Sequence, residues 1–103
     1  MVIVVHGGLA EEEFLASDAL LRACEVATEA MKGKEAIEGV ESAVKVLEDD
    51  PRLNAGTGSF PNLLGEIEMS AGVMKDDYSC GGVAAIKNIK NPISVARAVM
   101  EQT

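Results

Sequence analysis

The stretch VIVVHGG, residues 2–8, decides what kind of fold this chain can form. Residues 2–5 are apolar at every position, which is typical of a strand that is covered on both faces and not of an edge strand with one wet side. His6 and two glycines then end the strand. The sequence therefore predicts a central strand at 2–5 that needs cover from two sides.

Two amphipathic helices are predicted after this strand. Gly33 stands where the first helix should end, and Asp49-Asp50-Pro51 breaks the pattern of the second. Their apolar stripes have helical spacing and consist of Leu20, Cys24, Ala27 and Met31 in the first helix, and of Ile37, Val40, Val44 and Leu47 in the second.

Short strands and a third helix follow. Residues 66–69 alternate polar and apolar, and residues 81–86 read as a strand of small residues over which another element packs tightly. Asn91 and Pro92 read as the N-cap and first residue of a helix whose apolar stripe begins with Ile93, Ala96 and Met100. The chain is therefore expected to be one partial domain over residues 1–103, an α/β (α+β) sheet with helices packed on it.

Composition excludes several classes of function. The chain has 103 residues, a net charge of −8, one Tyr, two Phe and no Trp, so it lacks the basic surface and the stacking aromatics of a nucleic-acid-binding protein. No apolar run is long enough for a bilayer, and no signal-type segment is present, so a cytoplasmic protein is expected. Cys24 and Cys80 are then expected as free thiols.

The amount of helix does not match the amount of sheet. Strands of this composition need cover on both faces, yet three helices suffice for about one side of a multistranded sheet. We therefore expect much of the cover to come from another chain or from further sequence.

A second unusual stretch is RLNAGTGSF, residues 52–60, directly after the second predicted helix. Its glycines let the backbone approach a ligand closely, and the amide of Asn54 can donate to one group and accept from another. This makes Asn54 a plausible orienting residue and a poor catalyst. Thr57 and Ser59 are hydroxyls with no nearby base in sequence.

His6, Gly7 and Gly8 are the other candidates. The only histidine follows a buried strand with no Ser, Cys or carboxylate beside it, which favours a structural hydrogen-bonding role over that of a base. The glycine N–H groups could hold an anion or a carbonyl oxygen. Neither a dinucleotide nor a phosphate-loop motif is present.

Glu48, Asp49 and Asp50 admit two interpretations. They could bind a divalent cation or, with the glycines, a phosphate, but consecutive carboxylates on a helix point in different directions. The acidic end of a solvated helix is therefore the favoured interpretation.

Four blocks in order, "VHGG", "LEDDPRLNAGTGS", "GEIEM" and "GGVAAIKNIKNPISVARAVMEQT", resemble the plant-type asparaginases, or isoaspartyl peptidases, of the N-terminal-nucleophile hydrolase superfamily. The resemblance implies a four-layer αββα sandwich. It also implies a precursor that cuts itself before a threonine, which becomes the N-terminus of a β subunit and uses its own α-amine as base. The family pattern Gly-Thr-Val-Gly is absent from these residues, so the chain, which stops at Thr103, is expected to be the front part of an α subunit.

The resemblance also assigns roles. Asn54 matches an asparagine that helps to orient the nucleophilic threonine, and His6-Gly7-Gly8 matches a mobile glycine loop tied to processing. The main-chain oxygens of six residues match those that hold a structural sodium ion: Leu47, Glu48, Asp50, Leu53, Ala55 and Thr57. No cofactor is implied for catalysis, the remaining substrate-binding groups are expected on the β subunit, and an (αβ)₂ assembly is expected.

Three departures from the family pattern concern Leu9-Ala10 after "HGG", Ser70 after "EM", and the "MKDD" turn at 74–77. The expected function is hydrolysis of L-asparagine and β-aspartyl dipeptides together with the β subunit. The alternative is a catalytically silent relative that acts as a binding or scaffold module.

Overall fold

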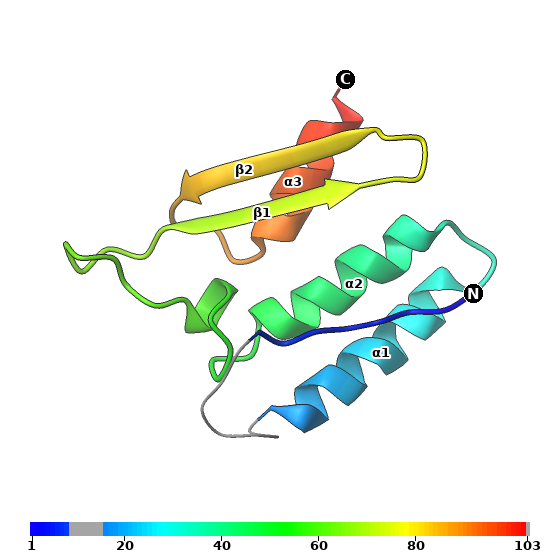
Figure 1. Ribbon diagram of the computed structural model, residues 1–103, viewed down its shortest axis with the longest axis horizontal. Coiled ribbons are helices and arrows are strands. Elements are labelled where there is room, and N and C mark those ends of the chain that lie inside the picture. The colour runs from blue at the N-terminus through cyan, green and yellow to red at the C-terminus, as the bar shows by residue number, and fades with distance from the viewer. Residues whose placement is uncertain (9–15, 103) are drawn as a thin grey trace.

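The computed structural model describes residues 1–8 and 16–102. In these residues it is a mixed α+β fold with three α-helices and a two-stranded sheet (Figure 1). The elements are α1 (Ser17–Met31), α2 (Ala36–Glu48), the 3-10 turn η1 (Gly56–Gly58), β1 (Met69–Met74), β2 (Cys80–Ile86) and α3 (Pro92–Glu101). All three helices and the strand at 81–86 are where the sequence predicts them. The strand predicted at 66–69 instead begins at Met69.

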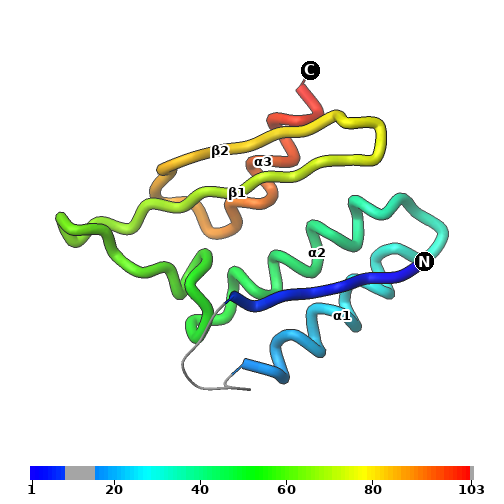
Figure 2. Tube along the Cα trace, viewed as in Figure 1, coloured from blue at the N-terminus to red at the C-terminus, as the bar shows by residue number. Residues whose placement is uncertain are grey.

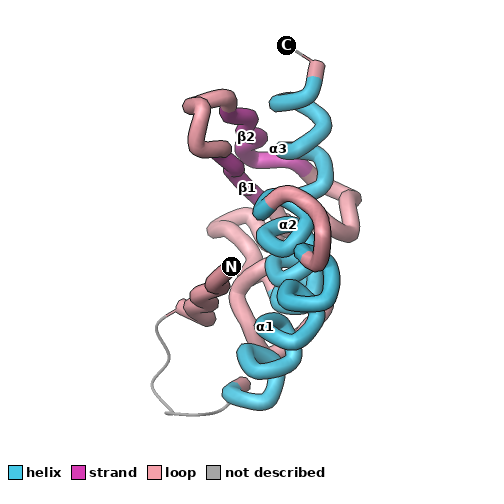
Figure 3. Tube along the Cα trace, turned by 90° about the vertical axis from the view of Figure 1, so that its right-hand side faces the viewer, coloured by secondary structure: helices cyan, strands magenta, loops and turns pink. Residues whose placement is uncertain are grey.

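The elements form a thin slab of two layers. Figure 3 shows the helices on one side and the extended segments, residues 1–8 with β1 and β2, on the other. The slab measures 42 × 34 × 18 Å. Its smallest dimension leaves room for one helical layer and one extended layer, and no described element lies over the far side of the extended layer.

Small residues let α1 and α2 approach closely. Ala23, Ala27 and Ala43 are buried where the two helices meet, and a Cβ on Gly39 would lie 2.2 Å from the Cγ of Met31. The buried stripe of α1 is therefore Ala19, Ala23, Ala27 and Met31. The predicted stripe is confirmed at Ala27 and Met31. It was wrong by one residue at Leu20 and Cys24, because the close approach selects Ala19 and Ala23 and leaves those two half-buried at the flank.

The N-terminal segment is extended but unpaired, so the central strand predicted at 2–5 is not formed among the described residues. Ile3 and Val5 pack against the alanine cluster of α1 and α2, whereas Val2 and Val4 are each 85% exposed. Among the described residues, no strand pairs with residues 2–5. The chain thus supplies one of the two covers that the all-apolar pattern predicts. Figure 2 shows the segment running alongside α2.

The sheet and α3 share a second core. β1 and β2 are antiparallel, and Val73 packs with Ile37, Ile93, Ala96 and Met100. A Cβ on Gly81 would lie 2.3 Å from the carbonyl oxygen of Ala96. The predicted tight packing over the small-residue strand and the predicted apolar stripe of α3 are both confirmed.

A bulge interrupts the sheet where Ser70 faces two residues of β2. Met69 pairs with Ile86 and Ala71 with Val83, and Ala85 has a positive φ of 55°. The N–H of Ala85 donates to the hydroxyl of Ser70 over 3.2 Å. Ser70, one of the departures from the family pattern, therefore satisfies a backbone group that the bulge removes from the ladder.

One face of the extended layer is bare. We define the outward β face as the residues on the side of the layer that faces away from the helices. They are Val2, Val4, Ser70, Gly72, Met74, Cys80, Gly82 and Ala84, and all are exposed. None of these is charged. A face of small and apolar residues on a protein with a net charge of −8 is typical of a surface that another element covers.

A groove runs along α2 between the N-terminal segment and the β1–β2 hairpin. Its apolar floor includes all four residues of the predicted stripe of α2, namely Ile37, Val40, Val44 and Leu47. One end, beside residues 3–6, has a volume of about 130 Å³, and the other, beside Met1 and the hairpin turn, about 560 Å³. We call it the α2 groove. The predicted stripe is therefore only partly covered by described residues.

Arg97 links α3 to α2. Its guanidinium donates to both carboxylate oxygens of Glu38, at 2.9 and 3.0 Å, to Glu41 at 2.9 Å and to Glu101 at 2.7 Å. The side chain of Arg97 is only 18% exposed. The hydrogen bond from Arg97 lowers the pKa of the Glu38 carboxyl.

None of the helices in the described ranges is long and apolar enough to cross a membrane.

We expect Arg97→Ala to lower the Tm of the complete native protein, because it leaves Glu38 and Glu41 side by side without their shared cation. Lys32→Ala is the matched control, since it removes a single ion pair, with Glu29, whose side chains are 69% and 76% exposed. Thermal unfolding followed by circular dichroism measures both. A Tm loss for Arg97→Ala no larger than that for Lys32→Ala would contradict the expectation.

We also expect the isolated 103-residue chain to self-associate or to be partly unfolded, because its outward β face and α2 groove are bare. Light scattering after size exclusion, together with dye binding, detects this. Val2→Lys combined with Val4→Lys should reduce association. Leu21→Lys, at a 62% exposed position on α1, should not. A monomer with one cooperative unfolding transition would refute the prediction.

Candidate active site

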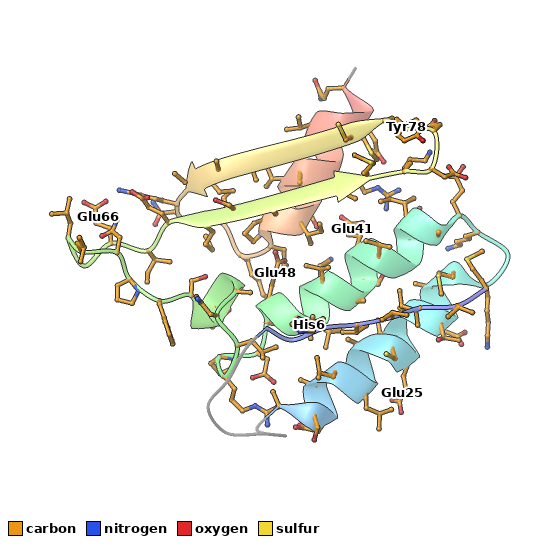
Figure 4. All side chains as sticks on the ribbon, viewed as in Figure 1. His6, Glu25, Glu41, Glu48, Glu66 and Tyr78 are labelled. Atoms are coloured by element: carbon orange, nitrogen blue, oxygen red, sulfur yellow. The ribbon has the colours of Figure 1, made fainter. Side chains whose placement is uncertain are left out.

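Two candidate segments meet at the C-terminal end of α2. His6 lies beside Leu47 at one end of the α2 groove, and the stretch after α2 turns back at the same place. Figure 4 shows His6 and Glu48 at this end of the helix. The fold thus brings together two segments that are more than 40 residues apart in sequence. We call residues 52–60 the Asn54 loop.

The glycines of the Asn54 loop are required by close backbone contacts. Gly56 has a positive φ of 51°, and a Cβ there would lie 2.4 Å from the carbonyl oxygen of Glu48. A Cβ on Gly58 would lie 2.1 Å from the carbonyl oxygen of Leu53. The loop therefore packs directly onto the end of α2 and onto its own first residues, which fixes its path.

Asn54 closes this loop. Its Oδ1 accepts a hydrogen bond from the backbone N–H of Phe60 at 2.9 Å. In the part of the chain that the structure describes, no group accepts a hydrogen bond from its NH₂. The amide oxygen is thus committed to the loop, and the exposed NH₂ is the group that Asn54 can offer to a ligand.

Arg52 anchors the start of the loop. Its guanidinium bonds both oxygens of Asp18, at the start of α1, at 2.9 and 3.0 Å, and it also bonds Asp50. The hydrogen bonds from Arg52 lower the pKa of Asp50 to about 2. Sequence reasoning missed this anchor, since Asp18 and Arg52 are 34 residues apart. The only local signal is that Asp50 stands two residues before Arg52. The Asp50 carboxylate caps the turn by accepting a hydrogen bond from the Arg52 N–H.

Glu48 is a buried carboxylate, 3% exposed, at the end of α2. Its Oε2 accepts the N–H of Ile93 at 3.0 Å, and its Oε1 accepts from Nδ2 of Asn91 at 3.1 Å. Burial raises the pKa of the Glu48 carboxyl, and these hydrogen bonds oppose the rise. Asn91 is the N-cap residue of α3, as predicted, but its side chain makes no cap hydrogen bond. Glu48 supplies that acceptor instead.

Sequence reasoning missed this role of the Glu48 side chain. The favoured interpretation as the acidic end of a solvated helix was wrong for Glu48, because its carboxylate is buried against the start of α3. The available signal is its position, because a carboxylate in the last turn of a helix lies at the unfavourable end of the helix dipole.

The three carboxylates at 48–50 do not all converge. Glu48 and Asp49 both accept a hydrogen bond from Nδ2 of Asn91 at 3.1 Å, whereas Asp50 bonds Arg52. Within residues 1–8 and 16–102, no group of three or more His, Cys, Asp or Glu side chains could hold a metal ion. The divalent-cation interpretation of the sequence therefore has no support in the described part of the chain.

His6 is held locally. Its Nδ1 accepts a hydrogen bond from the N–H of Gly8 at 3.0 Å, so this nitrogen carries no proton in that arrangement. Gly8 has a positive φ of 90°, and a Cβ on Gly7 would lie 2.9 Å from the side chain of Leu20. These contacts match the structural interpretation of His6. Leu9 and Ala10 lie outside the described residues, as does Thr103.

The main-chain oxygens assigned to sodium lie around the turn between α2 and η1. Those of Leu47, Asp50, Leu53 and Ala55 each accept one backbone N–H, at 2.9 to 3.3 Å. Each carbonyl keeps a second lone pair. Carbonyl oxygens are ligands that hard cations prefer. The side chains of Glu48 and Asp50 are engaged elsewhere, so only their backbone oxygens would contribute.

Comparison with known proteins identifies the family of this chain. A family model described as asparaginase matches residues 1–103. The isoaspartyl peptidase/L-asparaginase of Bos taurus is 46% identical over 109 aligned positions. These positions cover 99% of this chain and 35% of the bovine protein. That of Mus musculus is 44% identical over 110 residues, covering 100% of this chain and 34% of the mouse protein.

An archaeal relative gives the same picture. The plant-type L-asparaginase of Pyrococcus furiosus is 44% identical over 109 residues, covering 100% of this chain and 36% of the archaeal protein. This chain thus spans about a third of the length of these relatives. The family match over residues 1–103 and these identities show that the chain belongs to the asparaginase family.

Proposed function

We propose that this chain is part of an amidohydrolase that acts on the side-chain amide of L-asparagine and on β-aspartyl dipeptides. The observation that carries the proposal is the 46% identity over 99% of this chain to a bovine protein named isoaspartyl peptidase/L-asparaginase. The relatives are about three times as long as this chain, so the remaining parts of the active site are assigned to further polypeptide.

The proposed nucleophile is a threonine at the N-terminus of a second chain, the β subunit, released when a precursor cuts itself. The threonine hydroxyl oxygen attacks the amide carbon, and its α-amine takes the proton and delivers it to the departing ammonia. Water then hydrolyses the acyl-threonine ester and restores the free hydroxyl. The amine can act as base only after the peptide bond before the threonine is broken.

Asn54 is the proposed orienting residue for this threonine. Its amide oxygen is fixed by the N–H of Phe60, so its NH₂ has a defined direction. A donor held in this way can bond the threonine hydroxyl oxygen and align it for attack. His6, Gly7 and Gly8, at the same end of α2, are proposed to act in processing of the precursor.

The outward β face supports a β subunit as the partner. Eight uncharged residues, two of them glycines, are exposed on this face, and the apolar α2 groove lies between two extended segments. We propose that strands of the β subunit cover the face and enter the groove, and that further helices complete a four-layer αββα sandwich. Two such αβ units are proposed to pair as an (αβ)₂ assembly.

A structural sodium ion is proposed at the base of the Asn54 loop. The main-chain oxygens of Leu47, Glu48, Asp50, Leu53, Ala55 and Thr57 would hold it. When bound, the ion would supply positive charge that stabilises the turn and takes no part in the reaction. The support is the neutral oxygen donor set at this turn.

The complete protein is expected to release ammonia from L-asparagine, and mass spectrometry is expected to find a companion chain that begins with threonine. Ammonia release from glutamine is the control for amide specificity. If neither ammonia nor a threonine-terminated chain is found, the proposal fails. The alternative of a catalytically silent binding module then takes its place.

Asn54→Ala is expected to fold nearly normally and to lose activity, because an exposed side chain is removed and the donor for the nucleophile is lost with it. We expect turnover, or self-cleavage, to fall by roughly two orders of magnitude. Asn62→Ala is the matched control, since Asn62 also closes a turn by accepting two backbone N–H groups, but in residues 62–66. Wild-type turnover in Asn54→Ala would remove this residue from the site.

A further inference from the structure

We propose that Glu48 is a positioning residue that fixes the Asn54 loop relative to α3. This inference rests on the function proposed above, because the loop is assigned there to orientation of the nucleophile. It concerns the side chain of Glu48, which is distinct from the main-chain oxygen assigned to a cation.

The position of Glu48 is unfavourable for a charge. It is 3% exposed and ends α2, where the negative end of the helix dipole lies. An ionised carboxylate there needs strong partners to offset the loss of hydration. Those partners are not on its own helix.

The partners of Glu48 are at the first turn of α3. The N–H of Ile93 donates to Oε2 at 3.0 Å, and this hydrogen bond is buried. Nδ2 of Asn91 donates to Oε1 at 3.1 Å. The carboxylate thus lies at the positive end of the α3 dipole and replaces the side-chain cap that Asn91 does not make. It holds α3 and the end of α2 in one arrangement.

The same residue forms the surface on which the Asn54 loop rests. A Cβ on Gly56 would lie 2.4 Å from the carbonyl oxygen of Glu48 and 2.7 Å from its Cβ. No methyl group fits between them, so the loop backbone is in direct contact with Glu48. Gly56 lies inside the span that the Asn54–Phe60 hydrogen bond closes. A shift of Glu48 therefore displaces the segment that carries the Asn54 amide.

Glu38 provides a matched control on the same helix. It also links α2 to α3, through the guanidinium of Arg97 at 2.9 and 3.0 Å. It is ten residues before Glu48, which places it about 15 Å farther along the helix axis, away from the loop. Loss of Glu38 should weaken the contact between the helices without moving Asn54.

The experiment compares Glu48→Ala, Glu48→Gln and Glu38→Ala in the complete protein, with L-asparagine as substrate and activity expressed per mole of N-terminal threonine. We expect Glu48→Ala to lower kcat roughly tenfold or more with little change in KM, because the loop orients the nucleophile and does not bind substrate. Glu48→Gln keeps an oxygen for the N–H of Ile93 and should recover most of the kcat. Glu38→Ala should lower the Tm and leave kcat within about twofold.

In this kinetic comparison, either of two results would overturn the proposal: equal losses of kcat in Glu48→Ala and Glu38→Ala, or a rise in KM alone. If Glu48→Ala does not fold, Asn91→Ala is used in its place. It removes one of the two partners of Glu48 and should give an intermediate loss of kcat, whereas unchanged kcat would overturn the proposal.

If the wild-type protein releases no ammonia, the proposed function fails, and crystal structures decide the role of Glu48. An Asn54–Phe60 hydrogen bond still at 2.9 Å in Glu48→Ala, with the loop unmoved, would refute positioning, and a displaced loop would support it.

Discussion

The structure depends on the packing of an extended layer against helices on one side only. Alanines at the α1–α2 contact let the two helices lie close together, and Ile3 and Val5 complete that core from the extended layer. A second core joins α3 to the sheet through Ile93, Ala96 and Met100. In both cores, the buried side chains of the extended layer face the helices. The 18 Å thickness follows from this arrangement, as does the bare outward β face.

The candidate site is placed by polar contacts at one end of α2. Arg52 fixes the start of the Asn54 loop to α1 through Asp18, and Glu48 fixes the end of α2 to α3. Gly56 and Gly58 then allow the loop to lie against these anchors. The result is a loop that is bonded to α1, packs on the end of α2 and is linked to α3 through Glu48, which is the kind of rigid support that orientation of a reacting group requires.

Features with a local cause could be predicted from the sequence. The helices follow from apolar spacing and from stop signals such as Gly33, which has the expected positive φ of 65°. The small residues at 81–86 predicted that another element packs tightly on this strand, and the structure shows that this element is α3, against Gly81. The family resemblance, confirmed by the family match, pointed to the Asn54 loop as the place to look.

Features that depend on distant partners could not be predicted. Glu48 and Ile93 are 45 residues apart, so the spacing contains no sign of their hydrogen bond. The bulge opposite Ser70 depends on the register of two strands, which periodicity does not fix. The all-apolar pattern at 2–5 predicts cover on both faces. The described residues cover only the face of Ile3 and Val5, and the face of Val2 and Val4 is exposed.

Exposed and half-buried residues alternate along the N-terminal segment, and this affects how substitutions there act. Val2 and Val4 are 85% exposed, and by accessibility alone they would be classed as surface positions that tolerate change. In the proposed assembly the outward β face is an internal boundary, and these valines behave there as core residues that a different polypeptide completes. Solvent exposure in this chain is then no measure of mutational tolerance.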